Sequence, residues 1–336
     1  MPCNLKEYPA STLPGLTLFS GSDNACLKPT AVYLPPKYLE TKKKDLTVVL
    51  WLHGFYVKNH KFLFFNDAAR VREQVLRSGK NVVLIAPFLG DEEVDGEGNF
   101  YGDYTVKDLG DGKWGERYLD GILEALAKSQ KPPFPPAFDV NNLVIACHSG
   151  GGAGMRKLVG TLGKYRSRLQ ECWGFDCLYG ANAKPDDATF WYQFVSGKEG
   201  RPLYVVYGKS TARQSVKLYL MGKGRANALG NKVDPPGPPL KNLHVTIGHY
   251  LTFPSMGQNV SVDITDAQVD KLISQPPATA KQPAKTAKPQ EGDFVKQAVS
   301  NLRGNFIFMD EIKGFELHYY IAREFFCLRL RNSAFI

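Results

Sequence analysis

The sequence predicts an α/β protein in which helices flank a mostly parallel sheet, and three observations lead to this prediction. Short apolar runs recur between residues 31 and 248, and nearly continuous apolar runs are typical of strands that are covered on both faces. Amphipathic segments of helical length lie between several of these runs. The chain has 336 residues, of which 43% are hydrophobic and 22% charged, so it can bury one large core or two modest ones.

The predicted strands are rich in β-branched and aromatic residues, and several end at Gly or Pro. They are residues 31–36, 45–54, 81–87, 142–149, 172–180, 202–208 and 243–248. Helices are predicted at 63–79, which Gly79 closes, at 114–128 and at 152–170. Because strands and helices alternate, most neighbouring strands are expected to be parallel.

Three stretches interrupt this alternation. Residues 91–113 are acidic, rich in glycine and long for a connection, which favours a functional loop such as a cap. Residues 222–239 form a second irregular segment. Residues 274–290 contain mainly Pro, Ala, Lys and Thr with almost nothing to bury, so they are predicted to be a linker.

Composition narrows the class of protein. No segment has the roughly 18 uninterrupted apolar residues of a membrane span, and the N-terminus lacks the apolar stretch of a secretory signal. The six cysteines are scattered without a CxxC pair, so reduced thiols and a cytoplasmic location are expected, with export by another route left open. The net charge of +9 comes without a basic stripe of interleaved aromatic residues, so nucleic-acid binding is not expected.

The stretch NNLVIACHSGGGAGMRK (141–157) carries the strongest chemical signal. Its glycines fit neither a phosphate-binding P-loop nor the GxGxxG dinucleotide pattern, because the spacing fails in both cases. The remaining chemical interpretation is a nucleophile elbow with Ser149 at the apex of a sharp strand-to-helix turn. Such a turn needs small residues two positions before and after the apex, here Cys147 and Gly151. A tight turn without chemistry remains the alternative.

A second motif, WLHGF (51–55), ends an earlier strand with His-Gly. A turn of this kind can offer a backbone N–H to a developing oxyanion. The N–H groups of Phe55 and Gly150 are the predicted donors. His53 is expected to be a structural histidine that is hydrogen-bonded within the turn, with no role in proton transfer.

Together with NVVLIAP, IACHSGG and VYLPPKY, these motifs resemble the α/β-hydrolase superfamily, in particular its serine esterase and lipase-like members. The resemblance covers about residues 30–255 and includes the chain order Ser, acid, His. It implies acyl transfer by a Ser-Asp-His triad on a small-molecule or polymer-linked ester, without a cofactor. No metal-ligand constellation is evident either, because the histidines are not paired at i, i+4 and the cysteines do not cluster.

The resemblance places the base in the loop after the last core strand, where His249 stands. His244 lies within that strand and is expected to be structural. Family members usually carry the acid after the strand predicted here at 202–208, but no carboxylate follows it. Some members carry the acid one strand earlier, which points to Asp176 at the end of its apolar run.

Asp186 and Asp187 are the fallback candidates for the acid, with a solvated loop as their structural interpretation. Aromatic residues near the expected carboxyl ends of the strands could line a cleft for an aromatic or sugar group, or could pack against the flanks of the sheet. They are Phe55, Tyr56, Tyr101, Tyr104, Tyr179, Trp191 and Tyr250.

The sequence therefore predicts a serine hydrolase, with a carboxylic ester as the preferred substrate. Amidases, peptidases and acyltransferases use the same constellation. From another class, a catalytically inactive hydrolase fold that serves as a binding module stays open, because Cys147 replaces the usual first glycine and the usual acid is missing.

The expected organisation is an N-terminal segment (1–29), a catalytic domain (30–273), the linker (274–290) and a C-terminal segment (291–336). This last segment is apolar but short for an independent domain. It can dock on the core, bind a protein partner or be the remainder of a larger unit, and the sequence leaves these roles open.

Overall fold

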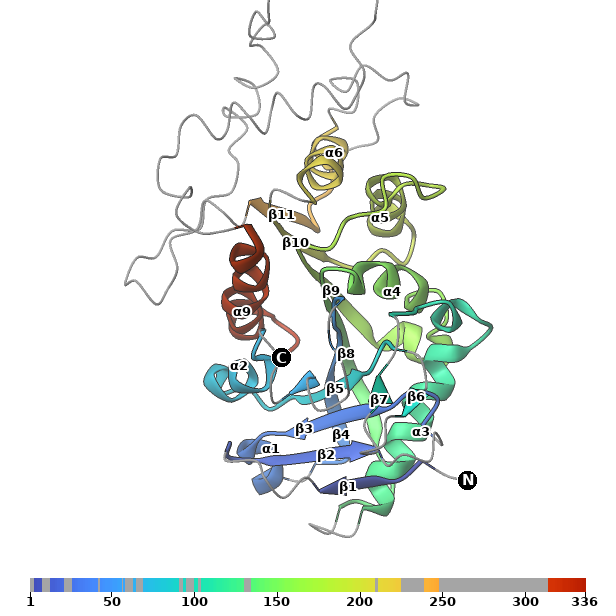
Figure 1. Ribbon diagram of the computed structural model, residues 1–336, viewed down its shortest axis with the longest axis vertical. Helices are drawn as coiled ribbons and strands as arrows, with labels where there is room; N and C mark the ends of the chain where they lie inside the picture. Colours follow the sequence, from blue (N-terminus) through green and yellow to red (C-terminus); the bar gives the residue numbers. More distant parts are fainter. Residues whose placement is uncertain are drawn as a thin grey trace, which may run out of the picture. The chain divides into compact units, whose positions relative to one another are not determined.

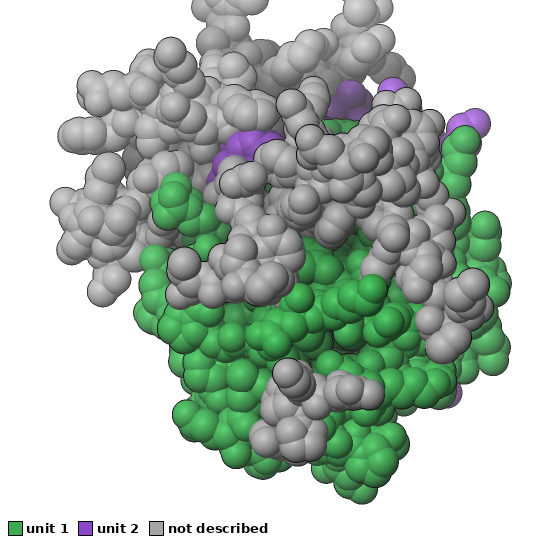
Figure 2. All heavy atoms as spheres, turned by 60° about the horizontal axis from the view of Figure 1, so that its bottom comes forward, with its two compact units in different colours: residues 1–177, 322–336 green, residues 178–321 purple. Residues whose placement is uncertain are grey.

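The computed structural model describes most of the chain between Cys3 and Gly224, a short stretch around residues 239–247 and a C-terminal helix. The described ranges are residues 3–7, 13–20, 26–41, 43–55, 57, 63–64, 69–90, 93–94, 100–101, 104–129, 134–208, 211–224, 239–247 and 314–336. The predicted linker at 274–290 lies outside them. The chain forms two compact units, unit 1 (Met1–Cys177 and Ala322–Ile336) and unit 2 (Leu178–Ile321), which Figure 2 shows in green and purple.

Unit 1 is built on a sheet whose central strands are parallel (Figure 1). Across the sheet the strands are β1 (Leu5–Glu7), β2 (Leu16–Ser20), β3 (Thr30–Leu34), β5 (Val83–Pro87), β4 (Asp45–Leu52), β8 (Asp139–His148) and β9 (Leu169–Phe175). Strands β5, β4, β8 and β9 pair in parallel, and β1 to β3 join the β5 edge in antiparallel pairs. Their nearly continuous burial agrees with the apolar runs that predicted them.

Helices cover both faces of this sheet (Figure 1). On one face, α3 (Trp114–Lys128) packs against α4 (Gly151–Leu158), so closely that a Cβ atom on Gly115 would lie 2.9 Å from the Leu158 side chain. On the other face, α2 (Val71–Ser78) contacts the second half of α9 (Gly314–Asn332). Gln74 of α2 accepts a hydrogen bond from Cys327 N–H (2.7 Å) and donates one to Ala322 O (3.2 Å).

Unit 1 also contains three short elements. They are α1 (Pro36–Thr41), the small hairpin of β6 (Glu93–Val94) and β7 (Phe100–Tyr101), and a 3₁₀ turn at Asp108–Gly110. The hairpin and the turn lie within the acidic 91–113 segment.

Phe326 anchors the end of the chain in the core of unit 1. Its fully buried ring lies 5.1 Å from the Trp51 ring of β4 and 5.9 Å from the Trp173 ring of β9, measured between centroids. Of the roles left open for the C-terminal segment, docking on the core is therefore the one observed for residues 322–336.

A buried ion pair adds to this anchoring. The carboxylate of Glu171, which is 2% exposed, accepts a hydrogen bond from the indole N–H of Trp173 (2.8 Å). It also lies 3.3 Å from a guanidinium nitrogen of Arg329 on α9. A buried carboxylate is costly without such partners, so both contacts favour the docked helix.

The N-terminal segment contributes strands that the sequence did not predict. Strands β1 and β2 extend the sheet of unit 1, and a disulfide joins Cys3, which precedes β1, to Cys26, which precedes β3. The expectation that all cysteines are reduced was therefore wrong for this pair. The remaining cysteines are free and buried: Cys147, Cys172, Cys177 and Cys327.

Two predicted helices are shorter than expected. The helix predicted at 63–79 begins only at Val71, because Arg70 has a left-handed backbone (φ 50°) that interrupts the helix on its N-terminal side. It ends at Gly79 as predicted, with φ 67°. The helix predicted at 152–170 ends at Leu158, and a 3₁₀ helix (Gly163–Arg168) begins at Gly163, whose backbone is left-handed (φ 50°). The helix at 114–128 has the predicted bounds.

Unit 2 contains the parallel strands β10 (Leu203–Tyr207) and β11 (Leu243–Ile247) with helices α5 (Asp187–Ser196) and α6 (Ala212–Gly222). The two helices are joined by a hydrogen bond from Ala188 N–H to the Gln214 side chain (2.9 Å). Among the helices of the described residues, none combines the length and apolar character needed to cross a membrane.

Replacing Phe326 by Ala tests the anchoring of α9. Removing a fully buried aromatic ring is expected to lower the free energy of unfolding by about 3–5 kcal/mol, measured by urea denaturation. The control is Leu328→Ala on the same helix, where the side chain is 40% exposed and the expected loss is below about 0.5 kcal/mol. Equal losses in the two variants would contradict the docked position of α9.

The disulfide is testable by alkylation of the denatured, unreduced protein followed by mass spectrometry. Four cysteines are expected to be labelled, and Cys3 and Cys26 only after reduction. The double variant Cys3→Ser/Cys26→Ser is expected to lose about 3 kcal/mol of stability, because the unfolded chain gains the freedom that the closed loop denied it. Labelling of all six cysteines before reduction would show that the bond is absent.

Candidate active site

Ser149 stands at the predicted sharp turn between β8 and α4. Its φ is 54°, a left-handed conformation that is uncommon for residues other than glycine and costs about 1–3 kcal/mol. Both of its peptide groups are fixed, since its N–H donates to Phe175 O (3.0 Å) and its carbonyl accepts from Gly152 N–H (3.1 Å). The surrounding structure therefore holds Ser149 in a strained position at the carboxyl end of the sheet.

The glycines after Ser149 are required by close backbone contacts. A Cβ atom on Gly151 would lie 2.3 Å from Leu52 O, and one on Gly152 would lie 2.2 Å from Cys177 O. The need for a small residue at Gly151 was predicted, and the structure supplies its cause. Cys147, on the other side of the apex, is fully buried.

The turn after β4 lies directly against Ser149. A Cβ atom on Gly54 would lie 2.5 Å from Cβ and 3.0 Å from Oγ of Ser149, so only glycine fits at this position. The next peptide group along the chain contains the N–H of Phe55, which the sequence predicted as an oxyanion donor. The backbone of this turn therefore lies too close to Ser149 to leave space for a side chain at residue 54.

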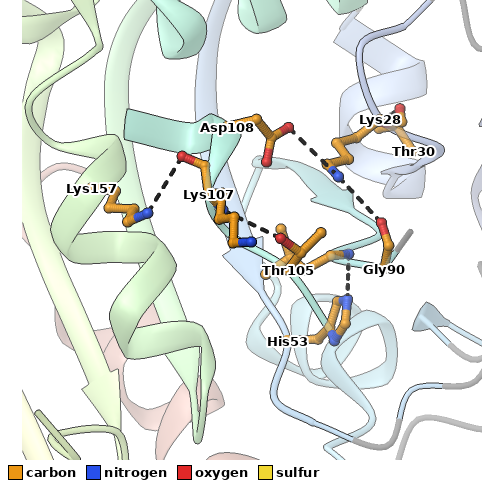
Figure 3. Close-up of polar contacts among 9 residues, drawn as sticks. Lys28, Thr30, His53, Gly90, Thr105, Lys107, Asp108 and Lys157 are labelled. Carbon is orange, nitrogen blue, oxygen red and sulfur yellow. Dashed lines mark hydrogen bonds and ion pairs between the residues drawn. The ribbon is translucent and has the colours of Figure 1, made fainter. Parts of the chain in front are cut away.

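His53 has both ring nitrogens engaged. Leu89 N–H can only donate, so Nε2 of His53 accepts from it (2.7 Å, Figure 3), and the ring proton must lie on Nδ1, which donates to Gly54 O (2.6 Å). Burial lowers the pKa of His53 to about 4, against the opposing effect of the bond to Gly54, so the ring is neutral near pH 7. The prediction of a structural histidine bonded within the turn is confirmed.

The bond from His53 fixes the plane of the Gly54–Phe55 peptide group. In a trans peptide the C=O and N–H point in opposite directions, so holding Gly54 O also sets the direction of the Phe55 N–H. A carbonyl that accepts a hydrogen bond also polarises its peptide and strengthens the N–H as a donor. His53 is thus a positioning residue for the predicted donor.

The segment after β5 that carries Leu89 is itself anchored (Figure 3). The ammonium group of Lys28, a residue only 4% exposed, donates to Gly90 O (3.2 Å) and lies 3.5 Å from an Asp108 carboxylate oxygen. This buried lysine joins the start of β3 to the end of β5 and to the 3₁₀ turn at Asp108–Gly110. Leu89, whose N–H donates to Nε2 of His53, therefore lies in a segment that Lys28 anchors.

The two residues with predicted donor groups are in contact. A Cβ atom on Gly150 would lie 2.9 Å from the Phe55 ring, which is itself 48% exposed. Within the described ranges, no acceptor is found for the Gly150 N–H.

Asp176 follows β9 directly, with a left-handed backbone (φ 46°) and an exposure of only 1%. Strands β8 and β9 pair with His148 opposite Phe175, so Ser149 and Asp176 leave adjacent parallel strands at the same level. The predicted acid therefore lies beside the predicted nucleophile in the fold.

The predicted base, His249, lies outside the described residues, as do Tyr56 and Tyr250. His244, which the sequence assigned a structural role, lies on β11, where its ring stacks on Tyr204 with centroids 4.4 Å apart. This position agrees with that assignment.

The solvated-loop interpretation of Asp186 and Asp187 was wrong. Asp186 caps α5 by accepting from Thr189 N–H (2.9 Å), and it pairs with Lys217 (2.7 Å). Burial raises its pKa, but the hydrogen bonds from Lys217 and Thr189 outweigh this effect and the net pKa is lowered. Asp187, 6% exposed, accepts from Gly180 N–H (2.6 Å). Both fallback candidates for the acid thus have structural partners within unit 2.

The aromatic residues differ in position. Trp191 is fully buried in unit 2 and therefore packs rather than lines a cleft, whereas Tyr179 is 45% exposed. Tyr104 contacts both Phe55 and Gly150, a role that sequence reasoning missed because no local pattern links residue 104 to these turns. Within the described residues, no group of three or more His, Cys, Asp or Glu side chains could hold a metal ion.

No family model and no curated protein matches the chain. Among solved structures, the chain is similar to an S-formylglutathione hydrolase from Agrobacterium tumefaciens (19% identity, 61% of this chain and 79% of that one, TM-score 0.39). It is also similar to a ferulic acid esterase (13% identity, 73% and 91%, TM-score 0.43) and to esterase B from Lactobacillus rhamnosis (11% identity, 65% and 70%, TM-score 0.35). The chain has the α/β-hydrolase fold that the sequence predicted. Its central strands are parallel, helices lie on both faces of the sheet, and the turn at Ser149 is strained.

The neutral state of His53 predicts a pH dependence of stability. The unfolded protein takes up a proton on this residue below about pH 6.5, whereas the folded protein resists protonation until about pH 4. The free energy of unfolding is therefore expected to fall between these values, by up to about 3 kcal/mol from this residue. In urea denaturation series over this pH range, His53→Gln should lose less stability on acidification than the native protein. Parallel curves would contradict a neutral buried His53.

Proposed function

We propose that this protein is a serine hydrolase that cleaves a carboxylic ester through an acyl-enzyme on Ser149. Ser149, His249 and Asp176 would form the triad, and the N–H groups of Phe55 and Gly150 the oxyanion hole. One observation carries the proposal: a serine is held in a left-handed conformation, and Gly54 lies so close to its side chain that no other residue fits there. A turn without chemistry would relieve this strain by placing glycine or asparagine at the apex.

In the proposed reaction, Oγ of Ser149 attacks the ester carbonyl carbon while His249 takes its proton. The carbonyl π electrons move to oxygen, and the Phe55 and Gly150 N–H groups stabilise the resulting oxyanion. As the C–O bond breaks, the leaving alkoxide takes the proton from His249 and departs as the alcohol. Water then attacks the acyl-enzyme with His249 again acting as base, and the acid and free Ser149 are released.

His249 is favoured as the base because other histidines are committed elsewhere. Both ring nitrogens of His53 are bonded to the backbone, and a pKa of about 4 makes it a poor base at neutral pH. His244 stacks on Tyr204 within a strand. His249 follows β11 within two residues, where the family resemblance expects the base.

Asp176 is favoured as the acid by its burial and by its position beside Ser149. A buried carboxylate can hold an imidazolium by charge and hydrogen bonding more strongly than an exposed one. The alternatives Asp186 and Asp187 already cap α5 and hold the Gly180 N–H.

The substrate is proposed to be a small-molecule or polymer-linked ester. The Cys3–Cys26 disulfide favours an oxidising compartment over the cytoplasm.

Fluorophosphonate labelling and hydrolysis of p-nitrophenyl acetate test the proposal. The native protein should be labelled and active, while Ser149→Ala and His249→Ala should lose labelling and roughly a millionfold in kcat. The control is Ser167→Ala, which should match the native protein. Ser167 is exposed on the 3₁₀ helix, and its hydroxyl donates to Lys164 O. Asp176→Asn should lower kcat on the order of 10⁴-fold without unfolding the protein.

The variants separate the parts of the proposal. A native protein that is folded but neither labelled nor active would favour the inactive binding module instead. Loss of activity in Ser149→Ala with full activity in Asp176→Asn would retain the nucleophile and reject the acid.

A further inference from the structure

Tyr104 links the two turns that carry the proposed oxyanion donors. Its hydroxyl lies 2.8 Å from Gly150 O, and its ring meets the Phe55 ring edge-on with centroids 4.5 Å apart. The Phe55 ring in turn lies against Gly150. Phe55, Tyr104 and Gly150 come from three separate segments of the chain, and each of them lies against the other two.

The Tyr104 hydroxyl is a donor in this contact. Burial raises the pKa of Tyr104 far above its ordinary value, and the nearby Cys147 adds to the effect, so the phenol stays protonated. Gly150 O is a carbonyl and can only accept, and it also receives the N–H of Ala153 (3.1 Å). Two donors therefore hold this carbonyl.

The hydrogen bonds to the Gly150 carbonyl help to fix the backbone of Gly150, whose N–H is one of the proposed oxyanion donors. Gly152 N–H holds the preceding carbonyl, Ser149 O, while Tyr104 and Ala153 hold the following one. Both peptide groups that flank Gly150 are thereby fixed, and with them the direction of the Gly150 N–H. Donors contribute most to catalysis when they are already aimed at the oxyanion and need no reorganisation.

The backbone of Tyr104 belongs to the network that holds the other donor. Thr105 N–H donates to Leu89 O (3.0 Å), and Leu89 N–H donates to His53, which holds Gly54 O. The Tyr104–Thr105 peptide is thus hydrogen-bonded to Leu89, and Leu89 is hydrogen-bonded to the His53 ring that holds Gly54 O, while the Tyr104 side chain holds Gly150 O.

We infer that Tyr104 is a positioning residue of the oxyanion hole, which sets the relative position of the Phe55 and Gly150 N–H groups. The inference rests on the proposed function. Tyr104 touches neither the substrate carbonyl nor the proton in transfer, so it acts through the two donors. Its loss should weaken binding of the oxyanion and leave binding of the uncharged ester nearly unchanged.

Tyr104→Phe tests this inference because it keeps the ring against Phe55 and removes only the hydroxyl. With p-nitrophenyl acetate, kcat is expected to fall about five- to tenfold, the effect of one hydrogen bond, with little change in KM. Tyr104→Leu, which also removes the aromatic contact, should lower kcat further. The kcat of Tyr104→Phe, which keeps the ring, should therefore lie between the kcat of Tyr104→Leu and that of the native protein.

A matched control is Tyr118→Phe. Tyr118 is a fully buried tyrosine of unit 1, and its hydroxyl shares a hydrogen bond with Thr30 Oγ1 (2.9 Å), a contact outside the turns at Gly54 and Ser149. Both Phe variants should lose similar stability in urea denaturation, while Tyr118→Phe keeps native kcat. This comparison separates a positioning effect from a general loss of stability.

Inhibition by an aryl trifluoromethyl ketone gives a second readout. Oγ of Ser149 adds to the ketone carbon, its proton passes to the base, and the carbonyl electron pair becomes an oxyanion in the hole. The inhibition constant should rise in Tyr104→Phe by the same factor by which kcat falls, and stay unchanged in Tyr118→Phe. A Tyr104→Phe variant with native kcat and native inhibition would overturn the inference while the hydrolase stands. A native protein without turnover or labelling would instead reject the proposed function.

Discussion

The steric contact between the turn after β4 and Ser149 is the constraint on which the site depends. Gly54 and Gly151 both lie where any side chain would overlap a neighbour, at 2.5 Å from Ser149 Cβ and 2.3 Å from Leu52 O. Glycine at these two positions is therefore what allows the turn after β4 to lie so close to the strained Ser149. The strain of about 1–3 kcal/mol is tolerated because the strands on either side of β8 are buried and cannot move apart.

The C-terminal helix α9 packs on the same group of strands. Phe326 packs on Trp51 of β4 and on Trp173 of β9, the two strands that flank β8. The Glu171 and Arg329 pair ties α9 to β9 from the same side. The second half of α9 thus packs on both strands that flank β8, the strand from which the strained turn emerges.

The sequence predicted the features that depend on local patterns. Apolar runs predicted the parallel strands, Gly79 the end of α2, and the small residues around Ser149 the sharp turn. Features that depend on contacts between distant segments were missed, such as the Cys3–Cys26 disulfide and the contact of Tyr104 with Gly150. Such pairings arise from tertiary packing, and no spacing along the chain encodes them.

The side chains of His53 and Tyr104, which hold the two turns with the proposed oxyanion donors, are both uncharged near pH 7. Desolvation keeps His53 neutral and Tyr104 protonated, so each acts as a hydrogen-bonding group with a fixed direction. A positive charge at His53 would attract the oxyanion, but it would also turn Nε2 into a donor facing the Leu89 N–H and break the bond that supports the turn. Neutrality is therefore what allows these side chains to hold backbone N–H groups in place, and the stabilisation of negative charge is left to the aligned peptide dipoles.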